Sequence, residues 1–422
     1  MEHFKFETKQ KAVLGGLMGL GLLCLLITFL TDDALHTRFW SNFLHNSVFF
    51  TGVAFMALFI LAAFTTSWAG WYTVMKRLWE AYALFLIPGL ALMLVLIIGL
   101  WGHWHHLYHW ADAEAVASDK ILQHKSAFLN KGWYTFGTFI IVGVWILFAW
   151  KMRQLSLDED KNGTPEYRHH HKMRIWAAAF LPLGGFTSAA MVWQWIMSVD
   201  AHWYSTLFAW YTGASWFVSA MALTIITLAF LKFIGYFENV TAEHLHDLGK
   251  FLFAFSIFWT YLWFSQYMLI WYANIGEETV YFYERQRDYP VLFYGNVILN
   301  FIVPFFVLMR NDTKRKYGTM VFVSIIVLLG HWIDFFQMIK PGVLHTAHEV
   351  LGHHQGAADH AAEAGHHASH FMMGFHFPGL LEFGTMIGFL AFFIYFVFMR
   401  LEKAALAPKN DPYYAESLQH HT

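Results

Sequence analysis

The chain has 422 residues, of which 57% are hydrophobic and only 13% are charged. Too few polar side chains remain to cover a water-soluble globule of this size, so the composition predicts a protein that lies in a lipid bilayer. The formal net charge of -2 is not the strongly basic balance of a nucleic-acid-binding domain, and no nucleic-acid partner is expected.

Ten stretches of the chain are long and apolar enough to cross a bilayer as helices, which takes about 20 residues each. The first follows Lys5, Lys9 and Lys11, as a signal peptide would, but it lacks a small-residue cleavage site and is retained as a helix. We therefore predict an all-α integral membrane protein in which residues 1–422 form one polytopic domain. The transmembrane helices are expected at residues 11–31, 46–70, 81–103, 131–151, 175–199, 205–231, 250–274, 289–309, 317–338 and 378–399.

The distribution of basic residues predicts the orientation, because lysine and arginine are kept in the cytoplasm. Of the 27 lysines and arginines, 20 fall on the side that holds both termini when the ten helices alternate in direction. Both termini are therefore expected to be cytoplasmic. Helices two to five and six to nine would each start on the same side, a layout compatible with two four-helix bundles plus two flanking helices.

The longest outer connection, residues 340–377, is a predicted extracytoplasmic loop with nine histidines. Its His366 and His370 stand one helical turn apart and could share a metal ion. We favour a low-complexity surface segment that lies on a partner, and expect no metal site. Residues 401–422, with Pro408 and Pro412, are expected to form a cytoplasmic tail.

The single cysteine, Cys24, excludes a disulfide within the chain, covalent haem attachment through paired cysteines and a cysteine-ligated iron–sulfur cluster. A haem held by two histidines from different helices is also disfavoured, because only His331 lies clearly within a predicted span. We therefore expect no cofactor bound by this chain.

Three ionisable residues lie inside predicted spans, where a charged side chain costs at least about 2.5 kcal/mol. His331 and Asp334 are three residues apart and share a face of the ninth helix, and Glu382 lies about one turn inside the tenth. They are candidates for handling protons. The alternative is a structural pair that locks two helices together.

Further protonatable groups are expected at the helix ends, where they either join a proton route or are ordinary interfacial residues that reach water. Near the outer face these residues are Asp200, His202, Glu277 and Glu278, and on the cytoplasmic side the possible inlets are Glu80, Glu238 and Asp247. No catalytic residue is assigned, and no motif identifies a quinone-binding residue.

Two segments carry a resemblance to a known family. They read Ser-Val-Asp-Ala-His-Trp-Tyr-Ser-Thr at 198–206 and Gln-Tyr-Met-Leu-Ile-Trp-Tyr-Ala-Asn-Ile-Gly-Glu-Glu-Thr at 266–279. They resemble the F subunits of bacterial alternative complex III, a quinol:cytochrome c oxidoreductase, within the wider NrfD-like (polysulfide reductase) family of membrane subunits. The likeness extends over nearly the whole chain.

The resemblance implies a cofactor-free subunit with two four-helix bundles in the bacterial cytoplasmic (inner) membrane. The implied partners are a homologous NrfD-like quinol-binding subunit, extracytoplasmic subunits with haem c and iron–sulfur clusters, membrane lipids and a terminal oxidase. The quinol would be menaquinol or ubiquinol. Its oxidation would be coupled to proton movement through the positions in this chain that match: Asp200, His202, Glu277, Glu278, His331 and Asp334.

Our leading hypothesis is therefore a scaffold and proton conduit in a respiratory complex, which is not an enzyme alone. A second hypothesis is that this subunit binds its own quinol at the outer face, with Asp200 or His202 accepting a proton. A third is an independent secondary transporter with His331 and Asp334 as the coupling site.

Overall fold

The computed structural model describes residues 3–163, 166–354 and 374–421. In these ranges the fold is helical and contains no strand; the only β-type pairing is an isolated bridge between His3 and Ala405. Ten helices or helix runs among the described residues are long and apolar enough to cross a membrane. The chain is therefore a multi-pass membrane protein, as its composition predicts.

Seven of the ten spans are single helices, the fifth is extended by a short 3₁₀ turn, and two spans are interrupted. In chain order they are α1 (Thr8–Thr31), α2 (Thr37–Thr66), η1 (Trp71–Met75) with α3 (Lys76–Ala83) and α4 (Leu86–Trp101), α7 (Lys131–Asn162), α8 (Arg168–Trp195) with η3 (Met197–Val199), α9 (Leu207–Phe233), α10 (Ala242–Ala273), α12 (Pro290–Val297) with η4 (Ile298–Ile302) and α13 (Val303–Leu308), α15 (Tyr317–His354) and α17 (Leu380–Leu401).

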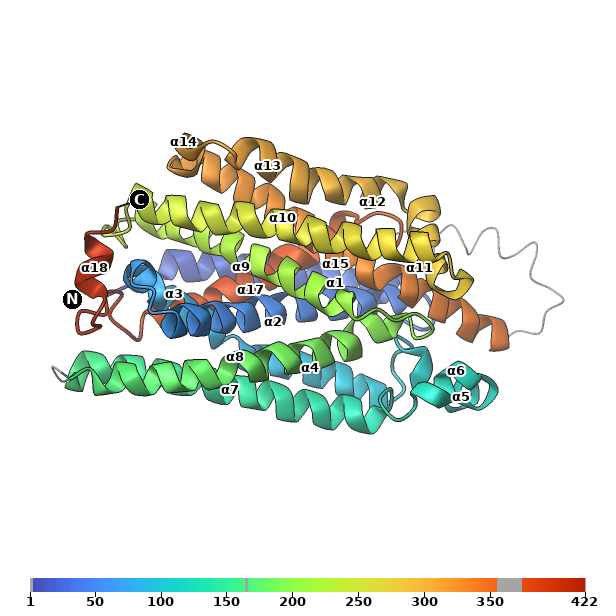
Figure 1. The fold of residues 1–422 in the computed structure, drawn as a ribbon. Coiled ribbons are helices and arrows are strands. Elements are labelled where there is room, and N and C mark those ends of the chain that lie inside the picture. Colours follow the sequence, from blue (N-terminus) through green and yellow to red (C-terminus); the bar gives the residue numbers. More distant parts are fainter. Residues whose placement is uncertain (1–2, 164–165, 355–373, 422) are drawn as a thin grey trace.

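The shorter elements lie at the two ends of the helix array (Figure 1). One end, which we call the termini end, carries both termini together with α14 (Asn311–Lys314) and α18 (Tyr414–Leu418). The opposite end, which we call the far end, carries α5 (Ala113–Ser118), α6 (Lys120–Lys125) and α11 (Gly276–Asp288).

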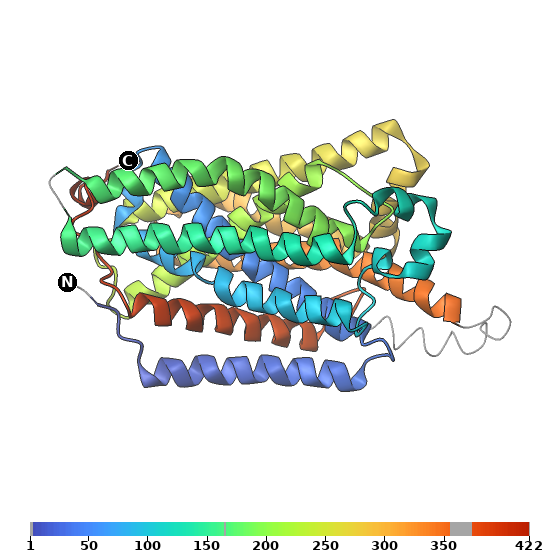
Figure 2. The same ribbon diagram turned by 90° about the horizontal axis from the view of Figure 1, so that it is seen from below.

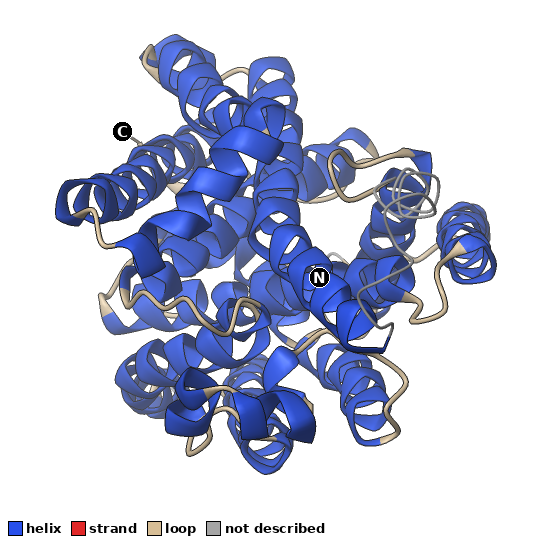
Figure 3. Cartoon of the chain, turned by 90° about the vertical axis from the view of Figure 1, so that its right-hand side faces the viewer, coloured by secondary structure: helices blue, strands red, loops and turns tan. Residues whose placement is uncertain are grey.

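The long helices contact one another in two rings. In the first ring α2 contacts α4, α4 contacts α7, α7 contacts α8, and α8 returns to α2. In the second, α9 contacts α10, α10 contacts α13, α13 contacts α15, and α15 returns to α9. The rings join where α2 meets α9 and α15, and Figure 3 shows the array viewed along the helices. Because α2 and α9 lie at this junction, they are buried on nearly all sides, as helices that are apolar all round usually are.

Helices α1 and α17 lie side by side at one edge of the array (Figure 2). Glycines allow this close approach, since a Cβ atom added to Gly21 would lie 2.5 Å from the Cα of Gly388. Packing through small residues is typical of helix pairs in membranes, where backbones gain van der Waals contact by coming close. Most of α1 remains exposed on the outside of the protein.

Helix α15 corrects the predicted start of the His-rich loop. The span was expected to end at residue 338, but the helix continues to His354. The reason is packing, because Val343, Leu344 and Ala347 are buried along one helical face beyond the expected end. The 340–377 segment is thus helical at its start. Its central part, with His366 and His370, lies outside the described residues.

Candidate functional site

Asp334 lies at the centre of a buried polar cluster between α9, α10, α12 and α15. Its Oδ2 accepts a hydrogen bond of 3.1 Å from the Trp259 indole, and its Oδ1 accepts from the Tyr211 hydroxyl and, at 3.1 Å, from the Asn296 amide. The residue is 1% exposed and forms no ion pair among the described residues. Such a carboxyl group can gain or lose a proton without breaking a salt bridge.

His331 belongs to the same cluster. Its Nδ1 shares a hydrogen bond of 2.9 Å with the Ser215 hydroxyl, one turn along α9 from Tyr211. Its Nε2 is buried without a partner among the described residues. The predicted shared face of His331 and Asp334 therefore exists, and it faces α9.

A small cavity of about 20 Å³ adjoins Asp334 on the side toward the far end. Gln266, Arg285 and Gln337 line it, and each has a buried side-chain nitrogen that lacks a partner in the described chain. A cavity needs roughly 10–15 Å³ to hold a water molecule, and a buried water usually makes about three hydrogen bonds. The volume of the cavity and the unpaired nitrogens that line it therefore suit one water molecule next to the Asp334 carboxyl group.

Arg285 connects this cavity to the far end. It lies on α11, is 2% exposed, and its Nη1 lies 3.9 Å from Oδ2 of Asp200. Asp200 is partly exposed and follows directly after η3. The polar groups thus extend from the far-end surface through Asp200, Arg285 and the cavity to Asp334. Tyr317, the first residue of α15, lies 17 positions before Asp334. At 1.5 Å per residue, this separation is about 25 Å along the helix.

Glu382 belongs to a different cluster. Arg38 binds it with two hydrogen bonds, of 2.7 and 2.9 Å, and Asn42 adds a third of 3.1 Å. Lys340 is fully buried and donates to Ser41 and Asn42, at 2.7 and 2.6 Å. Glu382 therefore lies outside the Asp334 cluster, and its contacts fit the structural alternative, in which a pair locks helices together. The Glu382 carboxylate joins α17 to α2 and, through Asn42, to α15.

His202 is paired with an aspartate at the far end. Its Nε2 bonds to Asp119, which precedes α6. Burial would raise the pKa of Asp119, but the hydrogen bonds from His202 and from the backbone N–H groups of Ile121 and Leu122 outweigh it and lower the pKa. The pair fixes the short helix α6 on the turn between α8 and α9.

The other predicted residues do not enter the Asp334 cluster. Glu277 is exposed and Glu278 partly exposed in the first turn of α11, where a carboxylate suits the helix dipole. Glu238 is exposed near the termini end. Asp247 is buried there but bonds to Lys250 at 2.7 Å and to His420 of the tail at 2.6 Å.

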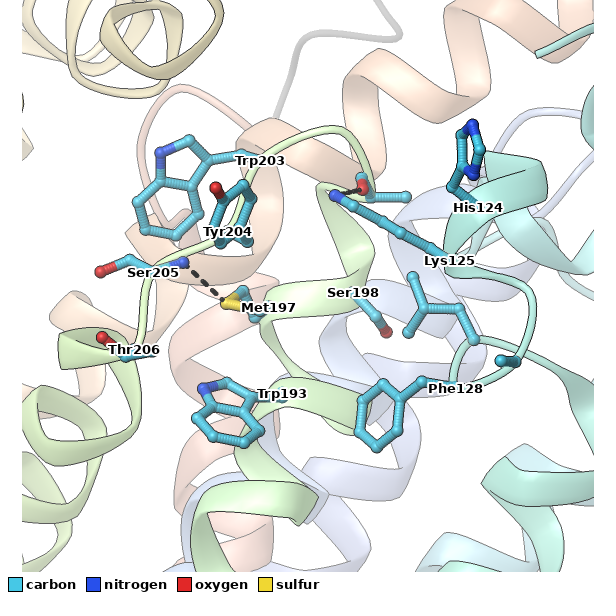
Figure 4. Close-up of a pocket in the computed structure, with 13 residues that line it drawn as sticks. His124, Lys125, Phe128, Trp193, Met197, Ser198, Trp203, Tyr204, Ser205 and Thr206 are labelled. Atoms are coloured by element: carbon cyan, nitrogen blue, oxygen red, sulfur yellow. Dashed lines mark hydrogen bonds between the residues drawn. The ribbon is translucent and has the colours of Figure 1, made fainter. Parts of the chain in front are cut away.

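A larger cavity of about 320 Å³ lies at the far end, between α6, the α6–α7 loop, the end of α8 and the α8–α9 turn (Figure 4). Its wall is mainly aromatic and apolar, including Trp193, Phe128 and Trp203. The indole nitrogens of Trp193 and Trp203 are buried without a hydrogen-bond partner in the described chain. Lys125 lines the cavity too, but donates to the carbonyl of Ala201 at 2.6 Å. Neither Asp200 nor His202 lines it.

Several residues of these clusters escaped the sequence reasoning. Neither Arg285 nor Lys340 stands out in the sequence, because each lies outside the predicted spans. Tyr211 and Asn296 carry no local signal, since hydroxyl and amide side chains are common in membrane helices. Burial raises the pKa of a further residue, Glu284, despite the opposing charge of Arg285, so this carboxyl near Asp200 holds a proton more readily than usual.

His45 also lies inside a helix, contrary to the expectation that His331 alone would do so. It is in the third turn of α2, and its Nε2 makes a hydrogen bond of 2.9 Å with the carbonyl of Trp332. His331 bonds to Ser215 instead. Each of the two histidines therefore already engages one ring nitrogen within the helix packing.

Comparison with models of known protein families gives no match, and comparison with curated protein sequences gives none either.

Proposed function

We propose that the chain is a membrane subunit of a respiratory quinol:cytochrome c oxidoreductase, in which it acts as scaffold and proton conduit. The observation that carries this proposal is the Asp334 cluster, whose deeply buried carboxyl group has no ion pair among the described residues. A water-sized cavity adjoins it, and Arg285, which lines this cavity, lies beside Asp200. Buried ionisable groups in membrane helices commonly mark proton or substrate routes.

In this proposal the termini end faces the cytoplasm of a bacterium and the far end faces outward. The excess of lysine and arginine on the termini side supports that orientation. The two contact rings support an arrangement of two four-helix bundles with α1 and α17 as flanking helices.

Electron transfer in this proposal belongs to partner subunits. Partners with haem c and iron–sulfur clusters would lie beyond the far end, and a homologous NrfD-like subunit would bind the menaquinol or ubiquinol. Quinol oxidation releases two protons for every two electrons. Asp200 and Glu284 lie at the far-end entrance, where released protons would be exchanged. Asp334 lies at the inner end of the polar groups that begin at Asp200.

Purification in a mild detergent tests the assignment to a complex. The chain should migrate with haem-staining polypeptides and with quinol:cytochrome c oxidoreductase activity. If it runs alone, without haem or quinol oxidation, the assignment is wrong and an independent transporter becomes the better account.

The variant Asp334→Asn tests the proton role within that complex. Asparagine keeps the size, and its amide oxygen can still accept from Tyr211 and Asn296. Its NH₂ group cannot accept from Trp259, and the side chain cannot carry a proton. Removal of a proton-transferring group typically slows a reaction by about 10²–10⁴-fold. We therefore expect proton translocation or quinol turnover in Asp334→Asn to fall by at least about tenfold. The matched control is Asp312→Asn, at an exposed residue of α14. Equal proton stoichiometry and turnover in both variants would remove Asp334 from the mechanism.

A second candidate function, a quinol site in this chain, is favoured by the far-end cavity. Its 320 Å³ is at the lower end of the range for ligand sites, about 300–1,000 Å³, and such sites are mostly apolar with a few polar groups. The free indole N–H groups of Trp193 and Trp203 are donors suited to a quinone carbonyl.

A cavity-filling variant tests this site. Ala127→Trp places a bulky ring at the cavity wall, whereas Ala117→Trp places one on α5 outside it. Quinone extracted from the purified protein should fall in the first variant and not in the second. Equal quinone content in both would exclude this cavity as the site.

A further inference from the structure

A second buried cluster lies at the termini end, away from the proposed proton route. Glu159 near the end of α7, His170 in the first turn of α8 and Asp411 in the tail converge there. One ligand atom from each lies within 4.8 Å of the other two. The three residues are only 2%, 4% and 6% exposed, so this is an enclosed site rather than a patch of surface charge.

The cluster contains polar atoms that the protein leaves unsatisfied. Both ring nitrogens of His170 and Oε1 of Glu159 are buried without a hydrogen-bond partner in the described chain. A buried polar group left without a partner costs about 1–3 kcal/mol. His170 also contacts the ring of Tyr413 edge-on, at 5.4 Å between centroids. A bound species from solution would satisfy these atoms.

The charges nearby also leave room for a cation. Glu80 and Asp160 are bound by Arg77, and Asp411 by Lys76. Glu159 is the carboxylate of this region that has no ion pair in the described chain. Asp411 accepts from Lys76 through Oδ2 and from the Tyr413 N–H through Oδ1, at 3.0 Å. Each carboxylate oxygen has two lone pairs, so Asp411 retains the capacity to bind a metal ion.

The geometry points to a binding site for a divalent transition-metal ion formed by Glu159, His170 and Asp411. One imidazole and two carboxylates form a mixed nitrogen and oxygen donor set, which suits Zn²⁺, Mn²⁺ or Fe²⁺. Ca²⁺ and Mg²⁺ prefer oxygen ligands alone. Metal–ligand distances of about 2.0–2.2 Å require the donor atoms of a tetrahedral site to be roughly 3.5 Å apart. Small side-chain shifts would close the site, and water can supply the fourth ligand.

The metal would fasten the tail to the helix array. Glu159 and His170 come from two long helices, whereas Asp411 comes from the segment between α17 and α18. Such an ion links the tail to α7 and α8 independently of quinol or proton chemistry. The inference therefore stands apart from the proposed function.

The test uses the full-length chain in detergent, stripped with a chelator, incubated with Zn²⁺ and desalted. Metal content is measured by mass spectrometry for the wild type and for the variants His170→Ala and Glu159→Gln. The wild type should hold about one ion per chain more than either variant, as expected for loss of a ligand from one site. His171→Ala is the matched control, since that neighbouring histidine is exposed. The His-rich 340–377 segment is the same in all four proteins, so metal bound there cancels.

Hydrogen exchange of residues 405–418 provides a second measurement. Zn²⁺ should slow this exchange in the wild type and in His171→Ala, and not in His170→Ala or Glu159→Gln. Glu159→Gln keeps the side-chain size, so it remains informative if the histidine variant fails to fold. Equal zinc content in all four proteins, or exchange of the tail that does not respond to Zn²⁺ in the wild type, would overturn the proposal.

Discussion

Asp334 and Glu382 are carboxyl groups at similar burial, 1% each, yet their surroundings differ in kind. Asp334 is bound by neutral donors only. Glu382 is bound by the Arg38 guanidinium in a two-pronged contact, the geometry in which an ion pair is strongest. Neutral donors leave a carboxyl group free to change its charge, whereas the ion pair holds Glu382 in its charged form. We therefore assign a proton-handling role to the first and a structural role to the second.

This assignment predicts that Glu382→Gln acts on stability. The change leaves the partly buried charge of Arg38 and the buried charge of Lys340 without the Glu382 carboxylate. Removing one partner of a buried ion pair costs about 3–5 kcal/mol. Unfolding followed by tryptophan fluorescence in detergent should report a loss of this size. The control, Glu277→Gln, changes an exposed residue and should stay within about 0.5 kcal/mol of the wild type. Equal stability of the two variants would contradict the structural role.

At the scale of elements, packing decides how firmly each helix is held. Helices α2 and α9 are buried among their neighbours, whereas α1 is largely exposed and is held mainly by α17. The contact relies on Gly21 and Gly388, and Cys24 packs against Gly384 one turn away. Chemical labelling of this single cysteine can therefore be used to follow the α1–α17 contact, and no further cysteine has to be introduced.

We predict that Gly21→Val loosens α1 from α17. The added side chain collides with the backbone of Gly388, and overpacking of this kind costs about 1–3 kcal/mol. Labelling of Cys24 by a membrane-permeant maleimide should become faster by about 5- to 150-fold, the factor that corresponds to this energy. Gly19→Val is the control, because a Cβ atom there meets nothing within 4 Å. Equal labelling rates in both variants would show that the close approach does not hold the pair.

At the scale of the whole molecule, the tail connects the two rings of helices at the termini end. Asp411 bonds to Lys76, Asn410 donates to the carbonyls of Glu159 and Asp160, and His420 contacts Asp247 of α10. The first contact reaches α3, which packs against α2 and α7 of one ring, the next two reach α7 itself, and the last reaches the other ring. The tail therefore acts as a clamp across the helix ends.

Acid should release this clamp. Burial would raise the pKa of Asp411, but the charge and hydrogen bond of Lys76 outweigh it and lower the pKa. The pair therefore stabilises the docked tail fully above the ordinary aspartate pKa of about 3.9, and the contribution is lost as the pH falls through the lower, folded-state value.

Hydrogen exchange of residues 405–418, corrected for the intrinsic effect of pH, should rise as the pH falls from 6 to below about 3.9. In Asp411→Asn, exchange should be fast at pH 6 and much less dependent on pH. If exchange in the wild type stays slow throughout this range, the Lys76–Asp411 pair does not hold the tail.

The sequence alone determined the number of spans. A helix that crosses a bilayer must satisfy its own backbone hydrogen bonds and present about 20 apolar residues, and both conditions are local. Ten such helices were predicted, and ten are found in the part of the chain that the structure describes. Asp334 and His331 were noticed for the same reason, since an ionisable residue in an apolar stretch is visible without knowledge of its neighbours.

Only the tertiary structure decided what these residues contact. The partners of Asp334 are 38 to 123 residues away in sequence, Arg38 and Glu382 are 344 apart, and Glu159 meets a histidine of the next helix and an aspartate of the tail. No local pattern encodes such pairings, because helix packing selects them. Hydrophobicity sets which segments enter the membrane, whereas the rotation of each helix against its neighbours sets which polar groups are satisfied, paired or left free.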